Sequence, residues 1–160
     1  VSLAGFVFGA ASLAGILQAI RWSWEPWLAP WVGIKSDGRH GRKKVLLLSL
    51  FLAALLFCLL PLDIPLLPWL FVVMGVQVTA TALTTLTDAV AADAANRTAK
   101  VLVLTAYSLA IDLGSAIGPI IGYLLNSNID PYAAYWMAAL SLLALAGAWL
   151  SPAKLESQPV

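Results

Sequence analysis

Apolar residues fill five long stretches of the chain, and short polar segments separate these stretches. Residues 3–20 contain only Ser12 and Gln18 as polar side chains, and residues 45–61 contain only Ser49. A helix of about 20 apolar residues spans the hydrocarbon core of a bilayer. The pattern predicts an all-α polytopic membrane protein with five transmembrane helices, over about 4–33, 44–61, 66–89, 100–125 and 132–150, and a tail over 151–160.

Connecting segments that carry lysine or arginine alternate along the chain with connecting segments that carry neither. The segment 33–44 holds five of the nine Lys and Arg residues, and 91–100 and the tail also carry basic residues. The segments 61–68 and 126–131 carry none. Because basic loops stay on the cytoplasmic side of a membrane, we expect a multi-pass cell-membrane protein with its amino end outside and its carboxyl end cytoplasmic.

Composition narrows the class of protein further. The chain is 61% hydrophobic and 11% charged, with a mean hydropathy of +0.90, whereas globular domains carry about 25% charged residues. One cysteine, Cys58, and one histidine, His40, supply neither a metal site nor a disulfide. We expect no enzyme, cofactor or metal. We also expect no nucleic-acid partner, because the basic residues lie in loops and form no aromatic-basic groove.

Polar residues follow one face of the third predicted helix. The spacing of Gln77, Thr81, Thr84 and Asp88 puts them on a narrow stripe. This stripe is a candidate path for a substrate or an ion. Threonine also bonds readily between helices, so a structural role as an interhelical contact is the alternative.

The fourth predicted helix carries a carboxylate near its middle. Asp112 shares a face with Ser108, and both are candidates for the substrate or ion path. An unpaired carboxylate in the bilayer is costly, so we expect Asp112 to be paired, protonated or in water. Proton coupling is one interpretation, and a hydrogen bond from a neutral Asp112 to a neighbouring helix is the other.

The first predicted helix ends in a crowded segment. Arg21 and Glu25 are four residues apart, a spacing that suits an ion pair, and Pro26 and Pro30 are expected to bend or break the helix. Arg21 and Glu25 are functional candidates if they lie near mid-membrane. In the alternative, the span ends at Ile20 and Arg21 snorkels to the headgroups within a tryptophan belt.

The basic segment has a recognisable spacing. Gly33 and Asp37 are followed, after Gly38, by four further residues of interest: Arg39, Gly41, Arg42 and Lys43. This spacing resembles the Gly-x-x-x-Asp-Arg-x-Gly-Arg-Lys loop of the major facilitator superfamily, with Gly38 as a one-residue insertion. The resemblance makes the segment a candidate conformational latch centred on Asp37, and the alternative is a plain topology signal.

A second motif lies in the fourth predicted helix. Gly114, Gly118, Pro119 and Gly122 resemble the Gly-x-x-x-Gly-Pro-x-x-Gly-Gly motif of superfamily antiporters, with Tyr123 in place of the last glycine. Small residues at spacing four let another helix backbone approach closely. We therefore expect these positions to form a helix-packing face.

The resemblance implies a secondary active transporter that moves a small solute or drug by alternating access, with efflux and proton coupling as expectations. The implied partners are membrane lipid, the missing half of the same transporter, a small-molecule substrate and protons. In the superfamily, the amino-terminal half usually carries an arginine inside its fourth helix. The corresponding helix here, Trp69 to Val90, contains none, so the resemblance favours the carboxyl-terminal half, helices eight to twelve. The first residue, Val1, is then expected to be an internal cut in a longer protein. The alternatives are the amino-terminal half, helices two to six, and a non-transporting assembly or scaffold protein.

Overall fold

The computed structural model describes residues 2–3, 6–7, 10–37, 39–97, 99–130 and 132–150. Two short antiparallel strands precede five helices, with Ser2 opposite Val7 and Leu3 opposite Phe6. In order, the elements are β1 Ser2–Leu3, β2 Phe6–Val7, α1 Ala10–Lys35, α2 Arg39–Leu59, α3 Leu66–Ala95, α4 Lys100–Asn128 and α5 Ala133–Leu150. The predicted all-α class with five helices is confirmed.

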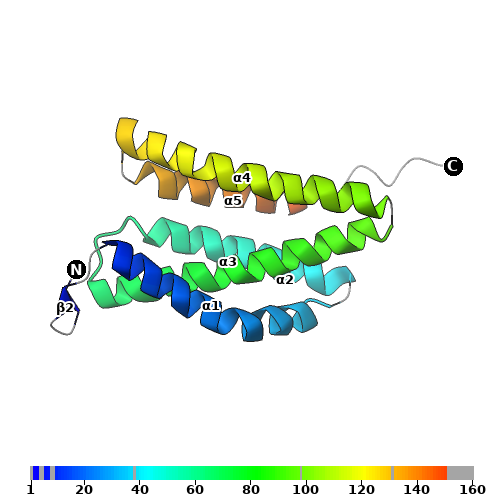
Figure 1. The fold of residues 1–160 in the computed structure, drawn as a ribbon, viewed down its shortest axis with the longest axis horizontal. Coiled ribbons are helices and arrows are strands. Elements are labelled where there is room, and N and C mark those ends of the chain that lie inside the picture. Colours follow the sequence, from blue (N-terminus) through cyan, green and yellow to red (C-terminus); the bar gives the residue numbers. More distant parts are fainter. Residues whose placement is uncertain are drawn as a thin grey trace.

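The first helix begins later than the sequence pattern predicted. Helix α1 starts at Ala10, not near residue 4, because Phe6–Val7 pairs as a strand. Aromatic and β-branched residues favour strands, and the sequence places Gly5 and Gly9 on either side of this pair. Pro26 and Pro30 lie inside α1, which continues to Lys35 and changes direction along its length (Figure 1). The prolines therefore bend the helix and do not break it.

The predicted basic loop is mostly helix. Helix α1 continues to Lys35 and α2 begins at Arg39, so only residues 36–38 connect them. Helix α3 likewise continues to Ala95, beyond the predicted end at 89. In both places the sequence pattern marked where apolar character ends, and a helix continues past that point because its backbone bonds do not depend on hydropathy.

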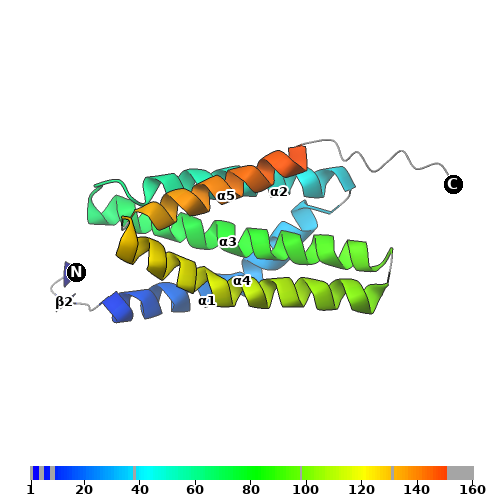
Figure 2. The same cartoon turned by 90° about the horizontal axis from the view of Figure 1, so that it is seen from above.

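The helices lie roughly along one long axis (Figure 1). Helix α3 packs against α1, α2 and α4, and α5 packs most extensively against α2. Figure 2 shows α5 beside α2, with α4 on the other side of α3. Because successive helices alternate in direction, the ends of α1, α3 and α5 and the starts of α2 and α4 gather at one end of the bundle (Figure 1). We call this end, which carries Arg42, Lys43 and Arg97, the basic end.

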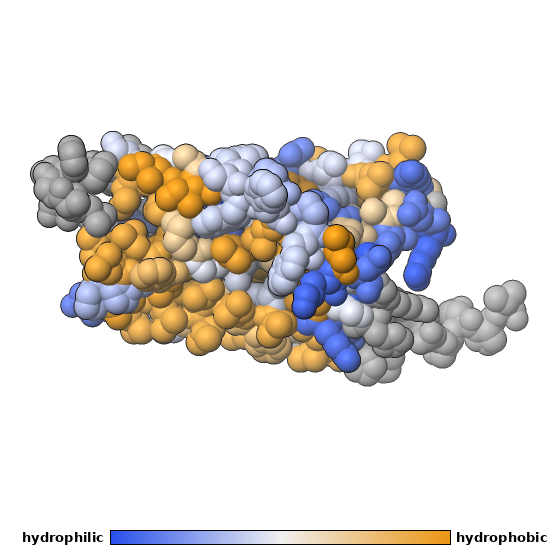
Figure 3. All heavy atoms as spheres, turned by 90° about the horizontal axis from the view of Figure 1, so that it is seen from below, coloured by the Kyte–Doolittle hydropathy of each residue, from blue (hydrophilic) through white to orange (hydrophobic). Residues whose placement is uncertain are grey.

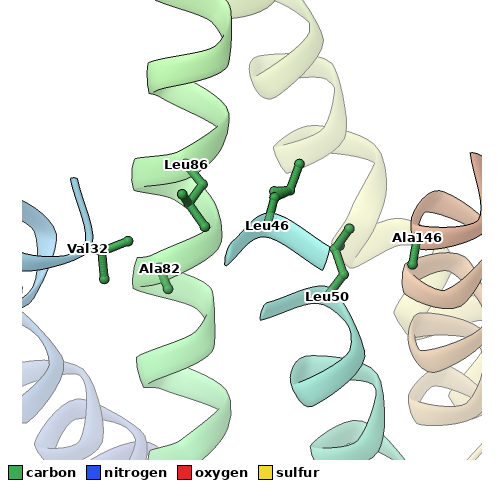
Figure 4. Close-up of a cluster of buried hydrophobic side chains, with 6 residues drawn as sticks. All are labelled: Val32, Leu46, Leu50, Ala82, Leu86 and Ala146. Carbon is green, nitrogen blue, oxygen red and sulfur yellow. The ribbon is translucent and has the colours of Figure 1, made fainter. Parts of the chain in front are cut away.

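The core joins four helices in a row. Val32 of α1 meets Ala82 and Leu86 of α3, while Leu46 and Leu50 of α2 lie between α3 and α5 (Figure 4). Ala146 of α5 completes this buried cluster.

Helices α2 and α3 also approach closely at a glycine. A Cβ added at Gly75 would lie 3.1 Å from a Leu56 methyl carbon. Gly75 therefore leaves room for the Leu56 side chain where α2 and α3 pack, a contact that sequence analysis did not single out.

Three helices are long and apolar enough to cross a membrane, judged on the described residues: α3, α4 through Ser127, and α5. The 21 residues of α2 include four basic residues among the first six: Arg39, Arg42, Lys43 and Lys44. The sequence pattern also predicted that α1 and α2 span the membrane, and for these two helices this remains a prediction.

Candidate functional site

The clearest polar constellation lies at the basic end. Arg42, in the first turns of α2, forms an ion pair and hydrogen bond with Asp93 of α3. A second nitrogen of the same guanidinium lies 3.5 Å from Asp37 Oδ1, in the connection between α1 and α2. Arg42 therefore links this connection to the last turn of α3.

Burial differs across this charged group, which we call the Arg42 cluster: Arg42, Asp37 and Asp93. The side chain of Arg42 is 18% exposed, against 83% for Asp37 and 54% for Asp93. The Arg42 Nε is buried and has no hydrogen-bond partner among the described residues. Removing a carboxylate from a largely buried guanidinium is costly, because the charge loses its partner and regains little water.

Sequence analysis predicted Asp37 as the latch residue and missed Asp93. The predicted end of the third helix at 89 left Asp93 in a loop, whereas α3 carries it to Ala95. The spacing gave no signal for Asp93, because it follows Asp88 by five residues and so lies about 140° away around the helix.

The remaining residues of the predicted latch have different places. Gly33 lies in α1, and its carbonyl accepts a hydrogen bond from Ser36 Oγ at 3.0 Å. Gly41 lies in α2, where an added Cβ would meet the Ser36 carbonyl oxygen at an ordinary 3.6 Å. Lys43 is exposed, and the side chain of Arg39 lies outside the described part of the chain. Ser36 is fully buried and was missed.

A second polar group lies between α1 and α3. The Gln77 amide nitrogen lies 3.5 Å from the Gln18 side-chain oxygen. Arg21 and Glu25 follow Gln18 on the same face of α1, yet the described residues show no ion pair between them, in contrast to the expectation. Arg21 Nε and Glu25 Oε2 are buried and lack a hydrogen-bond partner among these residues.

The polar stripe of α3 is not uniformly accessible. Thr81 is buried, whereas Thr84 and Asp88 are exposed. The hydroxyls donate within their own helix, from Thr81 to the Gln77 carbonyl at 3.2 Å and from Thr84 to the Ala80 carbonyl at 3.1 Å. These bonds do not join helices, so the predicted interhelical role of the threonines is not observed in the described residues.

Asp88 does join two helices. Its Oδ1 accepts a hydrogen bond at 2.6 Å from the Tyr107 hydroxyl of α4. The same hydroxyl oxygen lies 3.2 Å from Thr87 Oγ1. Sequence analysis gave no role to Tyr107, because a tyrosine in an apolar helix shows no partner until the neighbouring helix is placed.

A comparison with protein-family models supports this membrane bundle with its charged end. The model described as Major Facilitator Superfamily matches residues 1–159. The chain belongs to the major facilitator superfamily. No curated protein and no solved structure matches it at a significant level. The family predicted from the loop spacing and the glycine motif is thus confirmed.

Membership of the major facilitator superfamily gives a coarse function. The chain is of a transporter type and not of an enzyme family, and the apolar helices agree with an integral membrane protein. Among the described residues, no three His, Cys, Asp or Glu side chains gather as metal ligands.

Most residues of helix α4 are exposed and are not covered by other described helices. Ser108 and Asp112 are exposed, and neither makes a side-chain hydrogen bond or ion pair within the described part of the chain. A Cβ added at Gly114, Gly118 or Gly122 would meet nothing within 4 Å. The predicted packing face, which includes Pro119, is thus unoccupied by other described helices and is open to lipid or another protein segment.

Proposed function

We propose that this chain belongs to a secondary active transporter that moves a small solute across the cell membrane by alternating access. The observation that carries the proposal is the Arg42 cluster, in which one guanidinium joins the α1–α2 connection to the end of α3. Alternating access needs contacts that form in one state and break in another. An arginine shared by two carboxylates on different elements suits this role.

The proposal also states how the chain is oriented in the membrane and which half of the transporter it forms. The basic end faces the cytoplasm, because Lys and Arg are retained on that side. The chain contributes helices eight to twelve, the carboxyl-terminal half, since α3 contains no arginine. The missing half then completes the central cavity, as rocking of two repeats around a shared site requires.

The solute path follows the contact between α1 and α3 near Gln18 and Gln77. Buried polar atoms of Arg21 and Glu25 lack protein partners there, and leaving such a group unsatisfied costs about 1–3 kcal/mol. Water or a polar solute group at this position would remove that cost. This supports a hydrophilic small molecule or a drug with a polar group as the substrate class.

The latch is tested by a double-mutant cycle on Arg42→Gln and Asp93→Asn in the whole protein. We expect each single variant to shift the balance between inward-open and outward-open states, measured by distances between spin labels at the two membrane faces. Because both variants break the same contact, the double variant should resemble the single ones, with a coupling of about 0.5–3 kcal/mol.

Asp63→Asn serves as the control, because Asp63 is exposed at the opposite end of the bundle. This control removes the same charge and should leave the state balance unchanged. Additive shifts from Arg42→Gln and Asp93→Asn, or an equal shift in the Asp63 control, would contradict the latch.

Proton coupling is assigned to Asp112. An exposed carboxylate in the middle of an apolar helix is expensive in lipid, so it suits a position in a water-filled path. We expect Asp112→Asn to abolish pH-driven accumulation in proteoliposomes for a panel of drug-like fluorescent solutes while exchange of the same solutes continues. Asp112→Glu, which keeps a carboxylate, should retain accumulation. Undiminished pH-driven accumulation by the Asn variant would show that Asp112 has no part in coupling.

A further inference from the structure

Two adjoining cavities lie toward the basic end of the bundle. The outer one has a volume of about 430 Å³ and is lined by Arg42, Lys43, Asp93 and Arg97 together with apolar residues. The inner one has a volume of about 510 Å³ and is lined almost entirely by apolar side chains of α2, α3, α4 and α5. Both are lined by the same four residues: Leu46, Val90, Ala94 and Trp149. The two cavities therefore form one continuous amphipathic groove.

The mouth of this groove is positively charged. Three cationic side chains and one carboxylate line it. Arg42 is already shared between Asp93 and Asp37. In the described part of the chain, Lys43 and Arg97 make no ion pair, so their charges remain available to an anion. Figure 3 shows the most hydrophilic residues toward one end of the face in view, residues of intermediate hydropathy across its middle, and hydrophobic residues over the lower edge and the other end.

The inner part of the groove has the length and chemistry of a lipid tail site. Its walls include Leu83, Val103, Tyr107, Leu142 and Leu145. Leu83 and Asp93, at its two ends on α3, are ten residues apart, which corresponds to about 15 Å along a helix. Half of a hydrocarbon core is also about 15 Å. An acyl chain from the leaflet at the basic end therefore fits the distance from mouth to inner end.

We propose that this groove binds one anionic glycerophospholipid, with its phosphate between Lys43 and Arg97 and one acyl chain among the apolar residues. The charge at the mouth selects an anionic headgroup over a zwitterionic one, as in other basic pockets between transmembrane helices. The groove also touches the Arg42 cluster through Arg42 and Asp93. A bound lipid phosphate therefore lies beside the ion pair that links α2 to α3.

The test measures lipid binding to the full chain purified in detergent, by native mass spectrometry with phosphatidylglycerol or phosphatidylcholine of identical acyl chains. We expect one phosphatidylglycerol to be retained in preference to phosphatidylcholine. The double variant Lys43→Gln/Arg97→Gln should bind phosphatidylglycerol roughly 30-fold more weakly, on the basis of about 1 kcal/mol for each basic residue.

A matched control removes the same charge from the same end. Lys44 and Lys100 are exposed neighbours that line neither cavity. The double variant Lys44→Gln/Lys100→Gln should therefore bind phosphatidylglycerol as the parent does. An equal loss in both double variants would mean general surface attraction and would overturn the site, as would equal retention of phosphatidylcholine.

The acyl-chain part is tested separately. Val103→Trp fills the inner cavity and should weaken phosphatidylglycerol binding roughly tenfold through overpacking, with all charges intact. Val101→Trp, at a position that is 80% exposed on the same helix, is the control for folding and should bind normally. Displacement of the lipid by glycerol phosphate, which lacks acyl chains, would show a small-anion site and overturn the proposal of a lipid.

Discussion

Helices α3 and α4 have nearly equal length and similar hydropathy, yet they differ in packing. Leu86 of α3 is fully buried among residues of other helices, whereas Leu113 of α4 is 52% exposed. No residue in the most apolar window of α4 is buried, although this window is as suited to a membrane as that of α3. Hydrophobicity thus predicts which segments enter a bilayer, and it does not predict which segments pack against one another.

The physical reason is that lipid tails are as apolar as leucine. Between helices in a bilayer, association depends on close van der Waals packing and interhelical hydrogen bonds. Helix α3 has both, through Gly75 beside Leu56 and Asp88 beside Tyr107. Apart from Tyr107, the surface of α4 carries mainly leucine, isoleucine and open glycines, together with the exposed Ser108, Asp112 and Tyr123.

The largest expected difference between the two helices comes from core truncation. Leu86→Ala should lower the free energy of unfolding by about 2–5 kcal/mol, because it leaves a cavity in a packed cluster. Leu113→Ala removes the same atoms from an exposed position and should change the free energy of unfolding by at most about 0.5 kcal/mol. Equilibrium unfolding in detergent micelles measures both. Equal losses would show that α4 is packed as tightly as α3.

Glycine substitution gives the next largest contrast. Gly75→Leu should lower the free energy of unfolding by about 1–3 kcal/mol, because the new side chain collides with Leu56. Gly118→Leu meets no described neighbour and should leave the free energy of unfolding of this chain unchanged.

Sequence analysis predicted a helix-packing face that includes Gly118, so this pair of variants tests whether that face is used within the chain. Thermal unfolding in detergent distinguishes the two cases. If Gly118→Leu destabilises the chain as much as Gly75→Leu, then α4 packs through its glycines after all.

The smallest expected effect concerns the hydrogen bond that ties α4 to α3. Tyr107→Phe removes the donor to Asp88 and should cost about 1 kcal/mol. Tyr123→Phe is the control, because Tyr123 is an exposed tyrosine of the same helix. Hydrogen exchange along α4 should become faster in the Tyr107 variant alone. Unaltered exchange there would mean that the bond does not hold α4 in place.

Much of the fold was predictable because periodicity and charge have local causes. The number of helices and the family followed from apolar stretches and from the spacing of Gly33, Asp37 and the basic residues after them. Helix ends were less predictable, because Arg39 and Asp93 lie in helices that continue beyond the apolar segments. Hydropathy records the boundary of an apolar layer, and backbone hydrogen bonding follows other rules.

The site was predictable in part. Sequence analysis placed Asp37 and Arg42 in the same candidate latch, and a guanidinium nitrogen of Arg42 lies 3.5 Å from Asp37 Oδ1. Asp93 and Tyr107 were missed because their roles depend on which helix lies beside them. Arg21 and Glu25 were expected to pair from their spacing, yet spacing four only makes contact feasible, and side-chain rotamers decide whether it forms.

The connection between α1 and α2 also has a mechanical meaning. Only three residues separate Lys35 from Arg39, so the two helix ends cannot move further apart than about 14 Å even with the connection fully extended. Buried Ser36 bonds back to Val32 and Gly33 and shortens this tether further. A displacement of the α1 end is therefore transmitted to the start of α2. Such a movement stretches or compresses the contact between Arg42 of α2 and Asp93 of α3.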